Sequence, residues 1–254
     1  MELAIDTSSS TVSIALSHKG KILSELTWQS SQEHTVELTP NLAYLLKQAK
    51  VEPASLEAII VAKGPGSFNG LRVGISVAKG MALSLEIPLL GVSTLEAESY
   101  PFSYTGLPIC PILKASRGEI ATALYQWQND DLSRLREEHL TTLPALCSEV
   151  SRETLFCGEI DDMTDEIRQR LGELAIIPPG VARLPRAGFL AARGWQRLNR
   201  GERDNPAALQ PLYLRPPQIT TPGKSPPVTL TLNEVKGKGL KGISDSSPSV
   251  DGSE

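Results

Sequence analysis

The spacing of hydrophobic and polar residues predicts a β-meander at the start of the chain. Apolar stretches at residues 2–5 and 11–16 are separated by the polar turn 6–10, and the second stretch alternates between apolar and polar positions. Such alternation is typical of a strand with one buried face. A turn at residues 18–21 leads into a third stretch, 22–28, so three short strands are expected in succession.

The following segment alternates between predicted helices and predicted strands. A helix over 35–49 has apolar residues on one face, and Pro40 within it indicates either a late start or a bend. Continuous apolar runs at 58–62 and 88–92 are typical of strands buried on both faces, and a helix over 71–85 lies between them. This alternation predicts an α/β fold.

A second lobe is expected after a break over residues 100–108 that contains Pro and Gly. Strands are predicted at 109–113 and 120–127, on either side of a turn at 116–119. Further elements are expected at 155–157, at 162–171 and, as a helix, at 187–200. No internal repeat of the length found in solenoid proteins is visible.

The periodicity ends at residue 216. The segment 216–254 is rich in Pro, Ser, Gly and Lys, which predicts a disordered tail with at most one short strand, over 228–232. The chain therefore divides into an N-terminal lobe (1–100), a second lobe (101–215) and the tail. Whether the last helix of the second lobe and residues 211–215 pack back on the first lobe stays open.

Composition is that of an ordinary soluble globular protein. The chain has 254 residues, a formal net charge of −4, 40% hydrophobic residues and 21% charged residues. No apolar run reaches the length of a membrane span and no signal peptide is visible, so we expect a cytoplasmic protein without a membrane partner. Cys110, Cys147 and Cys157 form no CxxC pair and are expected to be small apolar fillers.

One segment is basic although the chain as a whole is acidic. The net charge argues against strong RNA binding by this chain alone, because phosphate binding depends on clustered Lys and Arg. Six arginines nevertheless lie between Arg183 and Arg203, with only Glu202 and Asp204 as acidic neighbours. We favour a solvated helix face, and a contact with RNA or with an acidic partner stays open.

The glycine-rich turn over residues 64–70, Gly-Pro-Gly-Ser-Phe-Asn-Gly, has three interpretations. A phosphate cradle would present N–H groups at a helix start, but the turn lacks the Gly-Lys-Ser/Thr ending and does not fit GxGxxG. A plain structural turn would use glycine for positive φ and Pro65 for stiffness. The third interpretation includes the helix that follows and assigns both to close packing.

Small residues form two rows along this helix. The first row is Gly70, Gly74, Ala78 and Ala82, and the second is Ser76, Gly80 and Ser84. Glycine inside a helix costs about 0.5–1 kcal/mol relative to alanine, so a gain from close approach is expected. The helix is also apolar on more than one face, which predicts burial on more than one face. One face is expected on the lobe's own sheet and the other on a partner; burial of both within one domain stays open.

We therefore predict a partner interface built from the two long helices. It combines the leucine stripe of residues 35–49 with one face of residues 71–85. The predicted interface residues are Leu38, Leu42, Leu45, Leu46, Gly70, Leu71, Gly74, Ile75, Ala78 and Ala82.

Several motifs together resemble the TsaB (YeaZ) family. They are Asp6-Thr7-Ser8, Glu33-His34-Thr35 with Pro40, the run from Gly64 to Ile75 continuing through Gly80, the stretch Gly91–Ala97, and Pro211-Leu212-Tyr213-Leu214-Arg215. The resemblance covers residues 2–215; it is dense in the first hundred residues and thin between 130 and 205. The GPGSF-x-G-x-R-x-G run is its most specific part.

The resemblance implies an actin/hexokinase-like (ASKHA) α/β fold of two related lobes. It also implies a non-catalytic partner of TsaD, the subunit that transfers a threonylcarbamoyl group to N6 of adenosine 37 in tRNA. The expected partners are TsaD in a heterodimer, the ATPase TsaE through the complex, and tRNA indirectly, with a homodimer as the alternative state. In the family, the helices that correspond to 35–49 and 71–85 form the dimer surface.

The residues depart from the catalytic relatives where those carry a His-x-Glu-Gly-His metal motif. Thr94 and Glu98 stand at the two histidine positions. Metal binding by such a motif needs two imidazoles on one helical face. The histidines present, His18, His34 and His139, have no such spacing. We therefore expect no catalytic residue, no metal and no cofactor.

Nucleotide binding is not favoured either. The turn after Asp6 contains no glycine, and Cys157-Gly158-Glu159-Ile160 lacks a second glycine for close approach. Asp6 is the single candidate for holding a Mg²⁺-bound phosphate, and a turn-capping role is favoured for it. Lys114 and Ser116 depart from the Asp-Ala-Arg usual in the family, so no function is carried over to that loop.

His34 has a catalytic and a structural interpretation. It lies between Glu33 and Thr35 at a predicted helix start, where a general base is conceivable. No nucleophile or metal partner is suggested nearby, so a helix-start role is favoured.

Three functions are compatible with the sequence. The leading one is a non-catalytic dimerisation and scaffold subunit of the tRNA threonylcarbamoyl transferase complex. The alternative is a stand-alone ATP-dependent kinase- or acyltransferase-type enzyme on the same fold, which would need Asp6 for phosphate binding. A self-associating dimer without either activity is the third.

Overall fold

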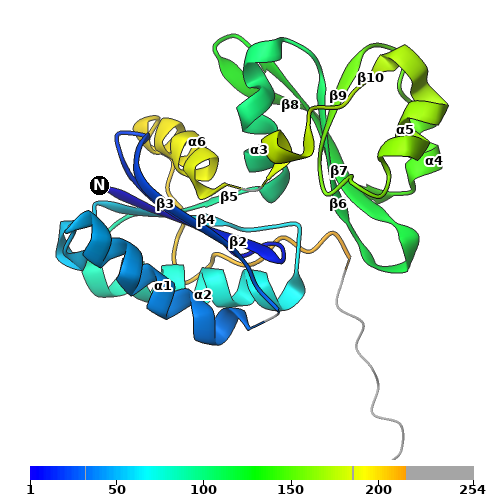
Figure 1. Ribbon diagram of the computed structural model, residues 1–254. Coiled ribbons are helices and arrows are strands. Elements are labelled where there is room, and N and C mark those ends of the chain that lie inside the picture. Colours follow the sequence, from blue (N-terminus) through cyan, green and yellow to red (C-terminus); the bar gives the residue numbers. More distant parts are fainter. Residues whose placement is uncertain (32, 185, 216–254) are drawn as a thin grey trace, which may run out of the picture. The chain divides into compact units, whose positions relative to one another are not determined.

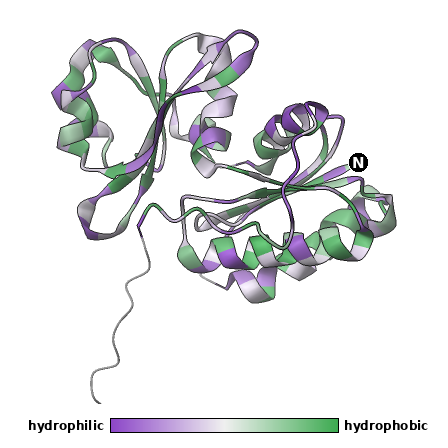
Figure 2. Cartoon of the chain, turned by 180° about the vertical axis from the view of Figure 1, so that it is seen from behind, coloured by the Kyte–Doolittle hydropathy of each residue, from purple (hydrophilic) through white to green (hydrophobic). Residues whose placement is uncertain are grey.

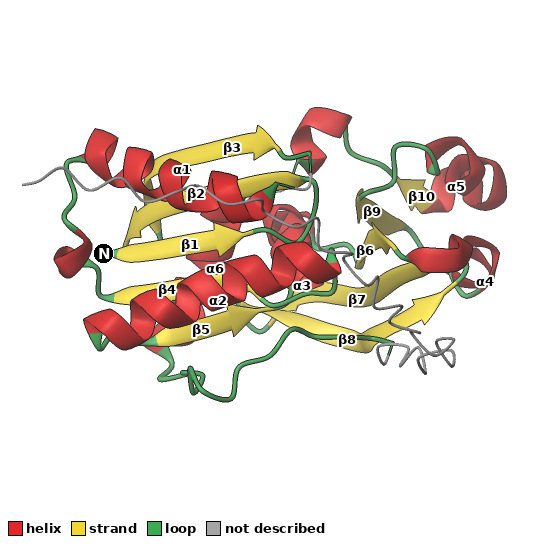
Figure 3. Ribbon diagram, turned by 90° about the horizontal axis from the view of Figure 1, so that it is seen from below, coloured by secondary structure: helices red, strands yellow, loops and turns green. Residues whose placement is uncertain are grey.

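The computed structural model describes residues 1–31, 33–184 and 186–215, and these contain two five-stranded sheets (Figure 1). The first sheet has the order β3-β2-β1-β4-β5 and the second β8-β7-β6-β9-β10 (Figure 3). The strands of the first are β1 (Glu2–Asp6), β2 (Thr11–His18), β3 (Lys21–Gln29), β4 (Ala58–Ala62) and β5 (Leu89–Val92). Those of the second are β6 (Ile109–Lys114), β7 (Ile120–Gln128), β8 (Asp131–Thr141), β9 (Thr154–Gly158) and β10 (Ala175–Ile176).

The two sheets have the same topology. In the first, β1 pairs with β2 in antiparallel and with β4 in parallel, so that Ile5 lies opposite both Ile14 and Val61. In the second, β6 pairs with β7 in antiparallel and with β9 in parallel. The chain is therefore an internal duplication, and it has the actin/hexokinase-like α/β fold of two related lobes that the resemblance to the TsaB family implies.

Helices cover both faces of the first sheet (Figure 1). The helices are α1 (His34–Ala49), α2 (Phe68–Leu85), α3 (Thr94–Ser99), α4 (Leu143–Ser148), α5 (Thr164–Leu171) and α6 (Ala187–Asn199). Helix α1 packs on β2 and β3, α2 packs on β1 and β4, and α6 lies on the opposite face. Helix α3 follows the first sheet in sequence but packs on β6, β7 and β9 of the second sheet. The first half of the chain therefore supplies α3 to the second sheet, and the second half supplies α6 to the first sheet.

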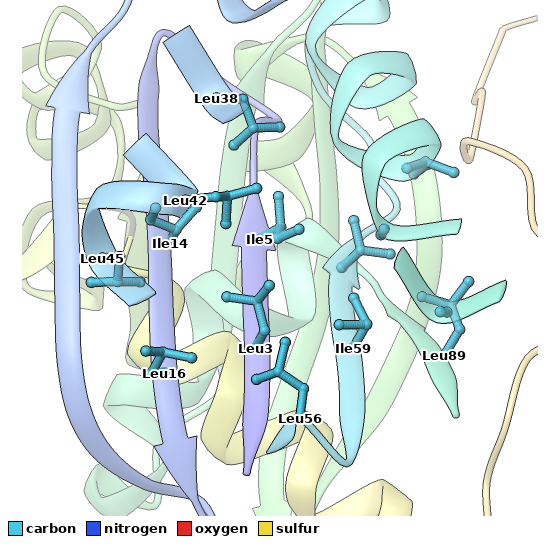
Figure 4. Close-up of a cluster of buried hydrophobic side chains, with 14 of the residues drawn as sticks. Leu3, Ile5, Ile14, Leu16, Leu38, Leu42, Leu45, Leu56, Ile59 and Leu89 are labelled. Atoms are coloured by element: carbon cyan, nitrogen blue, oxygen red, sulfur yellow. The ribbon is translucent and has the colours of Figure 1, made fainter. Parts of the chain in front are cut away.

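The core under α1 and α2 explains the leucine stripe. Leu38, Leu42 and Leu45 point toward the sheet, where Ile14 and Leu16 of β2 meet them (Figure 4). Each of these side chains is at most 4% exposed. Burying a leucine side chain contributes about 1.5–3 kcal/mol, so the stripe is a major part of the stability of this half.

Glycines in α2 allow the helix to approach the turn after β1. A Cβ at Gly70 would overlap the Thr7 carbonyl oxygen, and a Cβ at Gly74 would overlap Thr7 Oγ1. The Thr7 hydroxyl donates to the Gly70 carbonyl at 2.7 Å. Gly80 differs, because a Cβ there would meet no atom of residues 1–31, 33–184 or 186–215 within 4 Å. The first row of small residues therefore serves packing inside the chain, and Gly80 of the second row does not.

Several boundaries differ from the sequence-based expectation. Helix α1 runs through Pro40 without a late start, and α2 begins at Phe68 because the Ser67 hydroxyl caps it by accepting from Gly70 N at 3.2 Å. Strand β8 and helices α3 and α4 were not predicted. The segment 216–254, with its predicted disorder and short strand, lies outside the described residues, and the predicted boundary near residue 100 stays a prediction.

Within the described part of the chain, no helix is both long enough and apolar enough to cross a membrane.

The contrast between Gly74 and Gly80 gives a matched pair of substitutions in one helix. Gly74→Ala is expected to lower the free energy of unfolding by about 1–3 kcal/mol, because the added methyl overlaps Thr7. Gly80→Ala is expected to raise it by about 0.5–1 kcal/mol, because the methyl enters open space. Urea unfolding of both variants measures the two effects, and equal shifts of the same sign would contradict the packing described.

Candidate functional site

A cleft lies between the turn after β1, the start of α2 and the ends of β6 and β9. Ser8, Ser9 and Ser10 line it from the first half, together with the start of α2. Lys114 and Glu159 line it from the second half, and the cavity measures about 350 Å³. The carboxyl ends of β1 and β9 both point to this place, which is where open α/β sheets place their ligands.

Asp6, which precedes the serines that line this cleft, is already engaged within the chain. Its Oδ1 accepts from the Ser8 backbone N–H at 2.9 Å and from the Ser8 hydroxyl at 2.6 Å. The side chain is buried, and burial raises the pKa of its carboxyl. Asp6 thus closes its own turn, which is the capping role favoured for it from the sequence.

The glycine-rich turn, residues 64–70, also packs against Ser8. A Cβ at Gly66 would overlap the Ser8 carbonyl oxygen, and Ser67 N donates to that oxygen at 2.6 Å. Gly64 and Gly66 have φ of 105° and 157°, a conformation that glycine adopts at little cost. The turn therefore needs Gly66 and Gly70 for contact with residues 7–8, and Gly64 for contact with Leu71 and Leu212.

Thr94 and Glu98 form a polar pair on one face of α3, one helical turn apart. Thr94 Oγ1 is buried without a hydrogen-bond partner among the described residues, and Glu98 is 6% exposed. Burial raises the pKa of the Glu98 carboxyl well above its usual range, and the negative charges of Asp6 and Glu159 add to the shift. This position therefore favours a neutral carboxylic acid over a carboxylate.

Two further residues singled out from the sequence have structural partners. His34 is buried at the first residue of α1, with Nε2 3.2 Å from the Ser9 carbonyl oxygen. Lys114 forms an ion pair with Asp162 at 2.9 Å. Among the described residues, no group of three or more His, Cys, Asp or Glu side chains is arranged to hold a metal ion.

The residues predicted as a partner interface face the chain's own core. All ten are buried against the first sheet or the turn after β1: Leu38, Leu42, Leu45, Leu46, Gly70, Leu71, Gly74, Ile75, Ala78 and Ala82. An amphipathic pattern identifies the buried stripe of a helix but not what covers it. These ten side chains therefore pack inside the chain rather than at its surface. A partner interface elsewhere on the two helices stays a prediction.

The faces of the same helices that point away from the core are exposed and partly apolar. Both helices contain hydrophobic and hydrophilic residues (Figure 2). Val36 and Tyr44 of α1 are 65% and 54% exposed, and Leu83 of α2 is 61% exposed. Gly80 lies exposed on α2 near Leu83, with Val77 partly buried between the core and this surface. We call the exposed residues Val36, Tyr44, Gly80 and Leu83 the outer face.

An aromatic and cationic cluster at the start of α2 was missed from the sequence. The Arg72 guanidinium carbon lies 3.7 Å from the centre of the Phe68 ring, and Arg72 Nε donates to the Tyr213 hydroxyl at 3.0 Å. Tyr213 belongs to the segment 204–215, which runs along β5 and α2. Leu212 N in that segment donates to Lys63 O at 2.7 Å. The Pro-Leu-Tyr-Leu-Arg motif at residues 211–215 was the feature of the sequence that could have indicated this contact.

The basic segment is engaged in ion pairs. Arg193 is 5% exposed and binds Glu96 of α3 at 2.6 Å as well as Asp131 of β8. Arg197 also pairs with Glu96, and Arg200 with Asp131. The solvated helix face favoured from the sequence is therefore wrong for Arg193, whose charge links α6 to α3 and β8.

The fold and the cleft define a protein of the actin/hexokinase-like class. The family model "TsaD: tRNA N6-adenosine threonylcarbamoyltransferase" matches residues 21–180. The tRNA threonylcarbamoyladenosine biosynthesis protein TsaB of Bacillus subtilis is 34% identical over 217 residues, which is 84% of this chain and 93% of that protein. TsaB of Escherichia coli is 27% identical over 219 residues, 84% of this chain and 94% of that protein.

A solved structure agrees with these relatives. The Pseudomonas aeruginosa protein described as similar to peptidase YEAZ superimposes with a TM-score of 0.69 at 26% identity, covering 84% of this chain and 99% of that chain. The chain belongs to the TsaB (YeaZ) family, whose members are named for the biosynthesis of threonylcarbamoyladenosine in tRNA.

The environment of Glu98 predicts a pH-dependent stability. Because its pKa is raised in the folded state, its contribution is complete below the unfolded-state pKa, near 4.5, and is lost as pH rises toward the folded-state value. The free energy of unfolding of Glu98→Gln is therefore expected to rise relative to that of the natural protein, by up to about 1.4 kcal/mol per pH unit above that point. Urea unfolding between pH 5 and pH 8 measures the difference, where roughly this slope is expected.

The control for this series is the exposed Glu153→Gln, which should follow the natural protein at every pH. A constant offset between Glu98→Gln and the natural protein would show that Glu98 does not titrate as described.

Proposed function

We propose that this chain is a non-catalytic docking subunit of the tRNA threonylcarbamoyl transferase complex, and that its outer face binds TsaD. Its membership of the TsaB family supports a place in this biosynthesis. The match to the TsaD family model supports a partner of related fold. TsaE and tRNA would then be reached through TsaD, and a homodimer through the same face is the competing state.

Gly80 is the observation that carries the docking proposal. A glycine inside a helix costs stability, and at Gly74 the cost is offset by contact with Thr7. At Gly80 no contact with any residue in the described part of the chain offsets it. Close approach of a second helix would do so, since small residues let helix axes come nearer. The exposed Tyr44 and Leu83 supply the aromatic and aliphatic contacts typical of such an interface.

Asp6, Thr94 and Glu98 support a non-catalytic role. The carboxylate of Asp6 is occupied by Ser8, and Glu98 favours the neutral form. Thr94 and Glu98 also stand where catalytic relatives carry the metal-binding histidines. The alternative of a stand-alone ATP-dependent enzyme would require Asp6 to leave its turn and engage a phosphate.

Two substitutions on the outer face test the docking surface. Gly80→Leu and Tyr44→Asp are each expected to weaken binding to the cognate TsaD at least tenfold, about 1.4 kcal/mol. Gly80→Leu should also stabilise the isolated subunit, because the position is exposed and leucine favours helix more than glycine does. Calorimetric titration of TsaD measures the affinity, and urea unfolding measures the stability.

Val181→Asp is the control, because Val181 is 79% exposed in the second half, outside the outer face. It should bind TsaD as the natural protein does. Unchanged binding by both Gly80→Leu and Tyr44→Asp would show that the outer face is not the docking surface.

Asp6→Asn separates the docking subunit from the stand-alone enzyme. Asparagine keeps an oxygen that can accept from Ser8 but has no carboxylate for a Mg²⁺-bound phosphate. We expect tRNA adenosine 37 to be modified at the natural rate when this variant is combined with TsaD and the other components, and not at all without the subunit. Loss of modification by Asp6→Asn with intact TsaD binding would favour the enzyme.

A further inference from the structure

The second sheet has a face that its own helices leave partly open, and we propose that an amphipathic helix of a partner protein binds there. The site is a cavity of about 100 Å³ between α4 and strands β7 and β8. Among the residues that line it are Leu124, Leu146, Val150, Arg136, Glu149 and Arg152. We call it the α4 pocket. It lies on the second sheet, so the proposal does not rest on the outer face.

The internal duplication indicates what belongs on this face. In the first half the corresponding helix, α1, has 16 residues and covers β2 and β3, with Leu38, Leu42 and Leu45 against the sheet. Its counterpart α4 has 6 residues and packs mainly on α5. Among the residues that the structure describes, no helix covers the face of β7 and β8 beyond the end of α4, as α1 covers its counterpart. A helix from another protein fits the space that further turns of α4 would fill.

The floor of the pocket is suited to an aliphatic side chain. Leu146 and Cys110 are buried beneath it, while Leu124 and Val150 are partly buried at its walls. A dry cavity of roughly 150 Å³ lined by aliphatic and aromatic side chains binds benzene, so one of about two thirds that size accommodates a single leucine-sized side chain. An aliphatic residue on one face of a helix is such a group, and a nucleotide is far too large.

The rim gives the expected charge of the partner. Arg136 and Glu149 form an ion pair with each other and neutralise one another. Arg152 is exposed, and it donates one long hydrogen bond of 3.5 Å to the Gln126 side-chain oxygen. The rim is thus left with a net positive charge from Arg152. An acidic residue one helical turn from the anchoring leucine would complement it.

The test uses synthetic helical peptides of about four turns and the full-length chain. The first peptide has leucines at i, i+4 and i+7 and flanking glutamates, the second has alanines in place of the leucines, and the third has lysines in place of the glutamates. Methyl NMR spectra should shift at Leu124, Leu146 and Val150 with the first peptide. Fluorescence anisotropy should show at least tenfold weaker binding of the other two.

Variants of the chain sharpen the assignment. Val150→Trp, which fills the pocket from its wall, should weaken the first peptide at least tenfold while leaving the thermal midpoint and TsaD binding unchanged. Arg152→Glu should reverse the preference from the glutamate to the lysine peptide, which a merely destabilised fold would not do.

Three results would overturn the proposal. The first is the absence of methyl shifts at millimolar peptide. The second is equal binding of the leucine and alanine peptides. The third is a concentration-dependent dimer that Val150→Trp abolishes, which would assign the α4 pocket to a second copy of this chain.

Discussion

The contact between Thr7 and helix α2 holds the first half of the molecule in its observed form. The Thr7 hydroxyl donates to the Gly70 carbonyl at 2.7 Å, and Gly70 and Gly74 have no side chains that would keep the helix away. This approach fixes where α2 begins, and therefore where the glycine-rich turn runs and how the cleft is bounded. In the glycine-rich turn, the Ser67 N–H donates to the Ser8 carbonyl oxygen of the chain's own backbone.

Elements with a local sequence pattern could be predicted, whereas features that depend on distant parts of the chain could not. The alternation of β2, the buried run of β4 and the helical spacing of α1 are local patterns, and each predicted element exists. Strand β8 was missed because its charged residues, such as Arg134 and Glu137, are exposed and obscure the alternation. The duplication was hidden because α1 and α4 differ so much in length that no sequence period remains.

The candidate site was predicted less well, again for a physical reason. A leucine stripe states that one face of α1 is buried but not whether a sheet or a partner buries it. The engagement of Asp6 by Ser8 is local and was anticipated as a turn. The ion pairs of Arg193 with Glu96 and Asp131 join residues that are 97 and 62 positions apart in the sequence. No local pattern in the basic segment predicts them.

The exchange of helices between the halves makes them mutually dependent. Helix α6 lies on the first sheet, where Leu190 and Ala191 are fully buried, while α3 lies on the second, where Leu95 is fully buried. A chain cut near Gly106 would leave the first fragment without α6 and the second without α3. Each fragment would expose an apolar sheet face that only the other can cover, so the pair should act as complementing fragments rather than as two separable domains.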